Sequence, residues 1–402
     1  MRWRLSLIRA SMEGLRLLRT PAWPRAGVGP HPSPGPLVVD GFFGEALGVG
    51  RAAALTADAL EQAGFEVQRK SLRPALGRLL RGRRPPVSDR PGGVWLIHAN
   101  APECLIALMT HDPADWGDRY RIGYWAWETP EIPVAWARVA PWLHEIWTPS
   151  AFVAEAVRAG LDRLPAAPRP PVKVMPHPVA APAWLERRGA AGDGVVRTLV
   201  MFDGRSAYAR KNPWAAIEAW VRAFPVADPG AALTVKVGQV DVDPAAAARL
   251  RALVTERSDI RLLSDRMDDQ AVWRLIDGHD VFLSLHRSEG FGLGLAEAMD
   301  LGKTVIATAW SGNLEFMRSD ASVLVPFRLV PIDDPTGAYG GNVWAEPDVE
   351  AAAGALRRVV GDPAFRAAVA QTAPASIAAL RETWSKSALA GSALAALAAP
   401  TR

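Results

Sequence analysis

The segment that decides the fold of this chain is 281–299, with the sequence VFLSLHRSEGFGLGLAEAM. Its first five residues, 281–285, form a mostly apolar run of the length expected for a strand buried in a parallel sheet. The glycine-rich stretch Gly290–Gly294 follows, and a helix is expected to begin near Leu293. A strand joined to a helix by a glycine-rich turn is the repeating element of a doubly wound α/β sheet.

Two acidic residues flank this glycine turn. Glu289 stands before the expected helix, and Glu297 stands about one turn inside it. Glycines let the backbone approach a ligand closely, and the N–H groups of a first helical turn face an anion. A carboxylate at Glu289 can hold sugar hydroxyls, and one at Glu297, further along, can hold ribose hydroxyls. Two acids beside an anion-binding turn would repel a phosphate unless hydroxyls or cations lie between them. An ordinary strand-to-helix turn without a ligand stays open for this segment alone.

Cations occur upstream, in the loop 202–213 with the sequence FDGRSAYARKNP. It follows an expected strand, and Asn212-Pro213 is a typical helix start. Arg205 and Lys211 therefore stand at the carboxyl end of a strand, where they can neutralise a diphosphate, Arg with a planar fork and Lys with a point charge. We expect Lys211 to be an exposed cation directed at the diphosphate. The alternative is that both are ordinary solvated loop cations.

The rest of the chain repeats the alternation of strands and helices, which predicts two Rossmann-like doubly wound domains of the α/β class facing a cleft. We expect a basic, proline-rich extension at 1–36, a first domain at 37–180, a second domain at 181–374 and a helical segment at 375–402. The expected strands are 37–40, 65–67, 94–98, 122–125, 145–148, 172–175, 197–202, 233–237, 260–263, 281–285 and 304–308.

Composition limits the function classes. The chain has 402 residues, more than one core usually covers, and a net charge of +4 without any Lys/Arg block, so we expect no nucleic-acid partner. The sequence contains no run of 18 apolar residues, so we expect no transmembrane helix. The single cysteine, Cys104, lies in an apolar run and is expected to be a buried thiol, which fits a reducing cytoplasm. Residues 1–19 are either a basic helix in peripheral contact with the inner face of a membrane or a solvated extension.

Taken together, Arg205, Lys211 and the Glu289/Glu297 pair within Glu-Gly-Phe-Gly-Leu resemble the retaining GT-B glycosyltransferases of family four. The resemblance implies a sugar transfer from a nucleoside-diphosphate sugar to a glycan, lipid-linked or other hydroxyl acceptor, with the anomeric configuration kept. It also implies no cofactor and no metal ion. Arg205 and Lys211 would hold the diphosphate, Glu289 the transferred sugar and Glu297 the ribose. The donor would also contact the turn residues Gly290, Phe291, Gly292 and Leu293.

The first domain departs from that family in one respect, since many members carry a histidine that faces the transferred sugar. The corresponding stretch here, 123–130, has the sequence GYWAWETP and contains none. Glu128 and His98 are the candidates to replace it, and Gly44 lies in the glycine-containing turn after the first strand. These three residues are our expected acceptor-side positions.

Three other interpretations stay open. Gly48–Ala53 satisfies a loose dinucleotide-binding pattern, although no acidic residue follows the second strand, which disfavours an NAD-dependent oxidoreductase. Asp241 and Asp243 could form an acidic metal motif, although Asp243 before Pro244 is also a typical helix N-cap. A non-catalytic nucleotide- or carbohydrate-binding protein on the same fold is the third.

Overall fold

The computed structural model describes residues 23–26, 32–44, 48–73, 84–164, 169–187, 193–333, 339 and 341–398. Residues 1–19, the expected membrane-contact segment, lie outside them. The chain forms two compact units, which we describe separately. Unit 1 comprises 1–178, 332–342 and 381–402, and unit 2 comprises 179–331 and 343–380. The chain therefore returns twice to unit 1, which the expected division into 37–180, 181–374 and 375–402 did not include.

Unit 1 contains a six-stranded sheet in the order β2-β1-β3-β4-β5-β6, and every neighbouring pair is parallel. The central strand β3 is buried along its whole length, as expected for a strand covered on both faces. The strands are β1 (Leu37–Gly41), β2 (Val67–Ser71), β3 (Val94–His98), β4 (Tyr120–Tyr124), β5 (Glu145–Thr148) and β6 (Val172–Val174).

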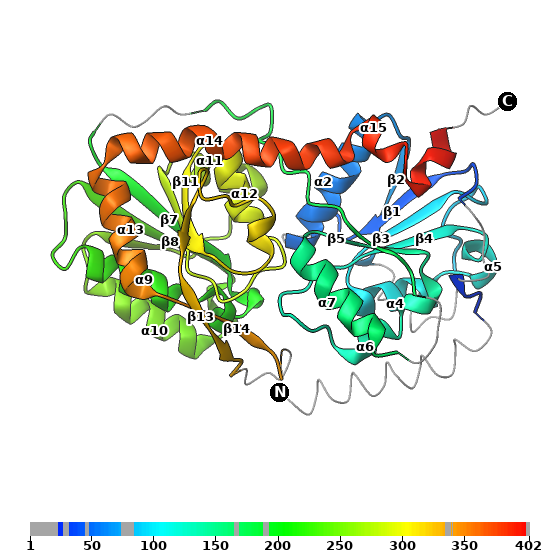
Figure 1. Ribbon diagram of the computed structural model, residues 1–402, viewed down its shortest axis with the longest axis horizontal. Helices are drawn as coiled ribbons and strands as arrows, with labels where there is room; N and C mark the ends of the chain where they lie inside the picture. The colour runs from blue at the N-terminus through cyan, green and yellow to red at the C-terminus, as the bar shows by residue number, and fades with distance from the viewer. Residues whose placement is uncertain are drawn as a thin grey trace. The chain divides into compact units, whose positions relative to one another are not determined.

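Helices cover both faces of this sheet (Figure 1), and apolar side chains fill the space on each side. One core contains Cys104 and a group of buried tryptophans that includes Trp125, Trp127 and Trp136. The helices of unit 1 are α2 (Gly48–Gln62), α4 (Ala101–Thr110), α5 (Pro113–Trp116), α6 (Val134–Ala137), α7 (Ala151–Asp162) and α15 (Lys386–Leu389).

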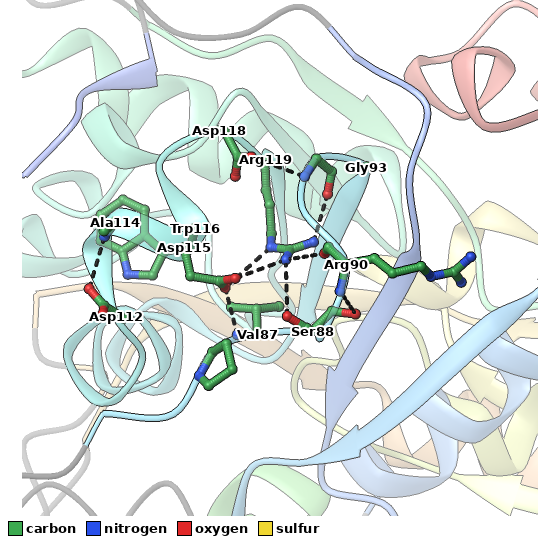
Figure 2. Close-up of polar contacts among 12 residues, drawn as sticks. Val87, Ser88, Arg90, Gly93, Asp112, Ala114, Asp115, Trp116, Asp118 and Arg119 are labelled. Carbon is green, nitrogen blue, oxygen red and sulfur yellow. Dashed lines mark hydrogen bonds and ion pairs between the residues drawn. The ribbon is translucent and has the colours of Figure 1, made fainter.

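A fully buried arginine fixes the segment before β3 (Figure 2). Arg119 donates to the carbonyl oxygens of Gly92 and Arg90, each at 2.6 Å, and to the carboxylate of Asp115 at 3.0 Å. The same carboxylate accepts from the Val87 N–H at 2.6 Å. A buried charge must be paired and hydrogen-bonded to be tolerated, so these contacts hold an otherwise irregular connection against the sheet.

Unit 2 contains a second six-stranded sheet in the order β12-β11-β10-β7-β8-β9, also parallel throughout. An antiparallel hairpin, β13 with β14, follows it. The strands are β7 (Val196–Asp203), β8 (Ala231–Gly238), β9 (Ile260–Leu263), β10 (Val281–Ser284), β11 (Thr304–Thr308), β12 (Val323–Val325), β13 (Phe327–Pro331) and β14 (Val343–Pro347).

In unit 2, helices α9, α10 and α13 pack on one face of the sheet, and α11 and α12 lie on the other (Figure 1). Side-chain caps begin several of them, and Asp243 caps α10 by accepting from Ala246 N–H at 3.0 Å, as expected for an N-cap. The helices are α8 (Tyr208–Lys211), α9 (Pro213–Ala223), α10 (Pro244–Thr255), α11 (Asp269–Asp277), α12 (Leu293–Asp300), α13 (Val349–Gly361) and α14 (Pro363–Arg381). None of the helices in the described ranges is both long and apolar enough to cross a membrane.

Candidate active site

The strand order of unit 2 determines where its loops meet. The chain runs from β7 outward to β8 and β9 and then returns to place β10 on the other side of β7. Ligands of parallel α/β sheets bind at such a reversal, outside the carboxyl ends of the two strands. The loop after β7 carries Arg205 and Lys211, and the loop after β10 carries Glu289. The two motifs found in the sequence therefore meet at this switch point.

A buried cluster of three charged side chains forms there. Glu289 pairs with Lys211 through one carboxylate oxygen and with Arg210 Nη1 at 3.1 Å through the other. The Arg210 guanidinium also donates to the Ser288 carbonyl oxygen at 2.9 Å. The side chains of Arg210 and Glu289 are only 5% and 10% exposed. Two cations and one carboxylate leave this cluster, which we call the Glu289 cluster, with one surplus positive charge.

The cations determine the ionisation of Glu289. Burial alone would raise its pKa, but Lys211 and Arg210 outweigh that effect and lower the pKa of Glu289 to about 2. The carboxylate is therefore ionised at neutral pH and acts only as a hydrogen-bond acceptor. An acceptor held in fixed geometry beside two cations suits a ligand that carries both hydroxyls and negative charge.

Two residues with positive φ determine the direction of the chain beside Arg210 and Lys211. Ala207 and Asn212, with φ of 64° and 49°, bracket the single turn α8, which ends at Lys211. Asn212 then caps α9 by accepting from the Ala215 N–H at 3.4 Å. A residue other than glycine with positive φ is uncommon, and such conformations gather at functional sites. The abrupt change of direction at Asn212 turns Lys211 toward Glu289.

A second loop supports the glycine turn. The Ser311 hydroxyl accepts from the Glu289 N–H at 2.8 Å, and the Gly312 N–H donates to the Glu289 carbonyl oxygen at 2.8 Å. A Cβ atom on Gly312 would lie 2.0 Å from the Gly290 carbonyl oxygen, so only glycine fits at this position. Gly292, with φ of 96°, then precedes α12, which begins at Leu293 as predicted.

The other two residues predicted to contact the donor, Glu297 and Arg205, lie in different environments. Glu297 is buried and is the fifth residue of α12, so one turn of helix separates it from Gly292. Arg205 is paired with Asp203, which it contacts at 2.7 Å, and its side chain is 38% exposed. The roles assigned to both residues stay predictions.

The expectation that Lys211 is an exposed cation is wrong, because its side chain is 20% exposed and ion-paired. Sequence reasoning also missed Arg210 and the fully buried His286, which lies between Ser284 Oγ and Asn313 Oδ1, both at 3.1 Å. Burial lowers the pKa of His286, so its ring is neutral. Only the position of these residues beside Lys211 and Glu289 in the sequence could have indicated them.

The switch point of unit 1 lies between β1 and β3 and is built differently. His98, the last residue of β3, is 3% exposed, stacks on Tyr124 at 4.1 Å and meets Thr56 Oγ1 at 3.1 Å. Burial lowers the pKa of His98 to about 3, so the ring is neutral. Gly44 follows β1 with φ of 76° and open space beside its Cα, and Glu128 is half-buried in the segment after β4. Their acceptor-side roles stay predictions.

The contacts of Cys104, Asp241 and Asp243 in the fold are those of structural residues. Cys104 is fully buried, and burial raises the pKa of its thiol, as expected for a core cysteine. Asp243 is occupied as a helix cap, and Asp241 pairs with Arg251 at 2.7 Å. These contacts favour the N-cap interpretation of Asp243 over a metal motif.

Comparison with known proteins agrees with this architecture. The Anabaena protein HepE in complex with UDP and glucose is 12% identical, with a TM-score of 0.61 over 87% of this chain and 97% of that chain. A glycosyltransferase from Rickettsia africae is 13% identical, with a TM-score of 0.60 over 89% and 99%. Sucrose-phosphate synthase from Thermosynechococcus elongatus is 15% identical, with a TM-score of 0.58 over 88% and 96%. No curated protein matches this chain.

Two Rossmann-like units define the GT-B fold. This protein has that fold, as predicted, and is similar in structure to the three proteins above. Residues 197–361 match the family described as Glycosyl transferases group 1. That match covers both loops of the unit 2 switch point. For this segment of the chain, it confirms the resemblance to glycosyltransferases that was drawn from the sequence.

Proposed function

We propose that this protein transfers a sugar from a nucleoside-diphosphate sugar to a hydroxyl group of a glycan or lipid-linked acceptor, with retention of the anomeric configuration and without a metal ion. The Glu289 cluster supports this proposal most directly. It lies at the switch point of unit 2, inside the segment that matches the glycosyltransferase family. HepE, which has the same fold, binds UDP and glucose.

The charges of the cluster suit the proposed donor. Arg210 and Lys211 carry two positive charges against the one negative charge of Glu289, and the first N–H groups of α12 add a positive helix end. A diphosphate leaving group gains negative charge as its bond to the sugar breaks. Fixed cations in a buried site stabilise such charge without a metal ion, because they need no reorganisation during the reaction. Arg205 lies near the same strand end, where it is paired with Asp203, so this pair adds no net charge.

The proposed reaction breaks the bond between the anomeric carbon and the diphosphate oxygen and forms a bond from the acceptor oxygen on the same face of the sugar. The acceptor proton passes to the leaving diphosphate, so no protein nucleophile is required. Glu289 would orient the transferred sugar through its hydroxyls, and Glu297 would hold the ribose. Gly290, Phe291 and Leu293 would bring their backbone close to the diphosphate.

The test combines binding with turnover. Thermal-shift screening against UDP, GDP and ADP identifies the nucleotide, because a ligand that binds the folded state raises apparent stability. Hydrolysis and transfer of the matching sugar donor are then followed by NMR, which also gives the anomeric configuration of the first product. We expect retention, and activity unchanged by EDTA.

Each other result has a defined meaning. Binding without hydrolysis or transfer would favour a non-catalytic binding protein on this fold. Loss of activity in EDTA, with recovery in Mg²⁺ or Mn²⁺, would contradict the metal-independent reaction. An inverted product would contradict retention while leaving the donor class intact.

A further inference from the structure

A fully buried histidine lies three residues before Glu289 in the loop after β10. The ring of His286 is 0% exposed. Ser284 Oγ lies 3.1 Å from its Nδ1, and Asn313 Oδ1 lies 3.1 Å from its Nε2. The Trp310 carbonyl oxygen is a further neighbour of Nε2, at 3.4 Å. An imidazole loses its water shell on burial, and these contacts offset a cost that an apolar side chain would not incur.

The neighbours of the ring determine where its proton lies. The Thr308 carbonyl oxygen can only accept, and it accepts from Asn313 Nδ2 at 3.0 Å, so Asn313 Oδ1 is the atom that faces His286. Oδ1 and the Trp310 carbonyl oxygen both need a donor, which Nε2 supplies when it carries the proton. Burial lowers the pKa of His286, so the ring is neutral and its Nδ1 accepts from the Ser284 hydroxyl. His286 therefore donates, as one defined tautomer, to the loop that follows β11.

The loop that accepts this hydrogen bond contains a strained residue. Ser311 has φ of 78°, a conformation that residues other than glycine rarely adopt. Such a conformation persists only where its surroundings impose it. Asn313, two residues further on, is fully buried, and its amide is held by His286 on one side and by the Thr308 carbonyl oxygen on the other. His286 therefore helps to hold the loop 311–313 in its strained conformation.

The same loop binds the backbone of Glu289. The Ser311 hydroxyl accepts from the Glu289 N–H, and the Gly312 N–H donates to the Glu289 carbonyl oxygen, both at 2.8 Å. The N–H and the carbonyl group of Glu289 are thus both bound by the two residues that precede Asn313. A displacement of Asn313 would move these two residues and, with them, the carboxylate of the Glu289 cluster.

We propose that His286 is a positioning residue for the transfer reaction, because it holds the loop 311–313, through Asn313, in the conformation that fixes the carboxylate of Glu289. This inference rests on the proposed function. The ring is fully buried, so its influence on the donor passes through Glu289, whose predicted partner is the sugar. Loss of the ring should therefore slow the reaction and leave binding of the nucleotide unchanged. A histidine that only fills the core would affect stability without separating these two quantities.

The first experiment measures the loop directly and needs no donor. His286→Leu removes the hydrogen bonds of the ring, His286→Gln keeps an N–H donor, and His279→Leu is the matched control. His279 is a partly buried histidine of the same unit, with its Nδ1 at 2.7 Å from the Leu275 carbonyl oxygen. Exchange of the Glu289 and Gly312 N–H hydrogens should become roughly tenfold faster in His286→Leu, because their partners are held less firmly. It should stay within twofold of the wild type in the other two variants.

The second experiment separates turnover from nucleotide binding. Calorimetry measures the affinity for UDP, GDP and ADP, and initial rates of donor hydrolysis are measured with UDP-glucose, GDP-mannose and ADP-glucose. In His286→Leu, kcat for the donor that the wild type uses should fall roughly ten- to hundredfold, whereas affinity for its nucleoside diphosphate should change less than twofold. His286→Gln should recover most of this rate. In a Glu289→Ala background, His286→Leu should cause no further loss, because the effects of residues that act through one another do not add.

Three results would overturn the inference. Unchanged exchange of the Glu289 and Gly312 N–H hydrogens in His286→Leu would show that His286 does not hold the loop. Hydrolysis within threefold of the wild type would remove it from the reaction. Equal losses of kcat and of nucleotide affinity, or a further loss in the Glu289→Ala background, would show a general disturbance of unit 2.

Failure of the proposed function gives a different result. A wild type that hydrolyses none of the three donors would refute that function, while the exchange measurement would still show whether His286 holds the loop. If His286→Leu does not fold, His286→Asn replaces it in both experiments, because its shorter amide does not extend to the position of Nε2.

Discussion

The two switch points of this protein share a topology and differ in charge. In unit 2, the loops after β7 and β10 bring together Glu289, Lys211 and Arg210, which are joined by ion pairs. In unit 1, rings gather at the ends of β3 and β4 and in the segment after β6: His98 stacks on Tyr124, and Tyr124 stacks on His177 at 5.4 Å. Burial keeps both histidines neutral by lowering their pKa values.

The comparison teaches that the strand order fixes where a ligand can lie, whereas the loop residues fix which ligand it can be. A fixed positive surplus suits a phosphate-bearing molecule. A neutral, aromatic environment suits an uncharged one, such as the sugar hydroxyl acceptor of the proposed reaction. That unit 2 binds the charged ligand and unit 1 the uncharged one is a hypothesis, which substitutions in each unit can test.

The largest effect is expected from Lys211→Ala. Removing one fixed cation from the site should lower transfer about 10²- to 10³-fold, or roughly 3–4 kcal/mol of transition-state stabilisation. Initial rates with the intact donor measure this loss, and Lys303→Ala is the control for removing a lysine that is ion-paired elsewhere in unit 2, with Asp277 at 3.3 Å. Because Lys211 is paired with Glu289, the melting temperature without ligand is measured in parallel. Transfer within threefold of the wild type would remove Lys211 from the site.

A smaller effect should separate the two acids. Glu297→Ala is expected to weaken binding of the bare nucleoside diphosphate about ten- to hundredfold, because a charge-assisted hydrogen bond to the ribose is lost. Glu289→Ala should leave that affinity nearly unchanged and lower transfer instead, because its partner is the sugar. Calorimetry and initial rates measure the two effects separately. Equal losses of nucleotide affinity would contradict the assignment of roles.

The smallest expected effect is a difference between His98 and Glu289 in how each makes the free energy of unfolding depend on pH. The folded-state pKa of His98 is lowered to about 3, so its contribution to stability is complete above the unfolded pKa near 6.5 and is lost as pH falls. The pKa of Glu289 is lowered to about 2, so its contribution is lost only below about pH 4.5.

Denaturant unfolding at pH 7.5 and 5.5 tests this difference. Replacing His98 by Gln should reduce the loss of unfolding free energy between these pH values by about 1 kcal/mol. The Glu289→Gln variant should show the same loss as the wild type in this range and a smaller one only at more acidic pH. An unchanged pH dependence for the His98 variant would show that its ring is not held neutral in the fold.

Much of the framework was predictable from the sequence. The strands 94–98, 145–148, 260–263 and 304–308 have the predicted bounds. For 94–98 and 304–308, which are buried along their whole length, the reason is that a strand covered on both faces is a mostly apolar run. The start of α12 at Leu293 was predictable from its glycine turn. These features depend on local sequence.

The details of the site depend on contacts between distant segments. Arg210 and Lys211 are adjacent cations in a loop, and nothing local shows that both are buried against Glu289, 78 residues later. The return of 332–342 and 381–402 to unit 1 likewise follows from packing and not from any signal at those residues.

Gly312 has a consequence for how variants of this protein are interpreted. It carries no reactive group, yet any side chain there would collide with the backbone of Gly290 and displace Glu289. A genetic screen for loss of activity would therefore recover Gly312 together with the charged residues of the site. The loss of activity in Gly312 variants would be attributed to a missing reactive group, although its cause is a change in the shape of the loop. Only a measurement of Glu289 ionisation in such a variant would separate the two causes.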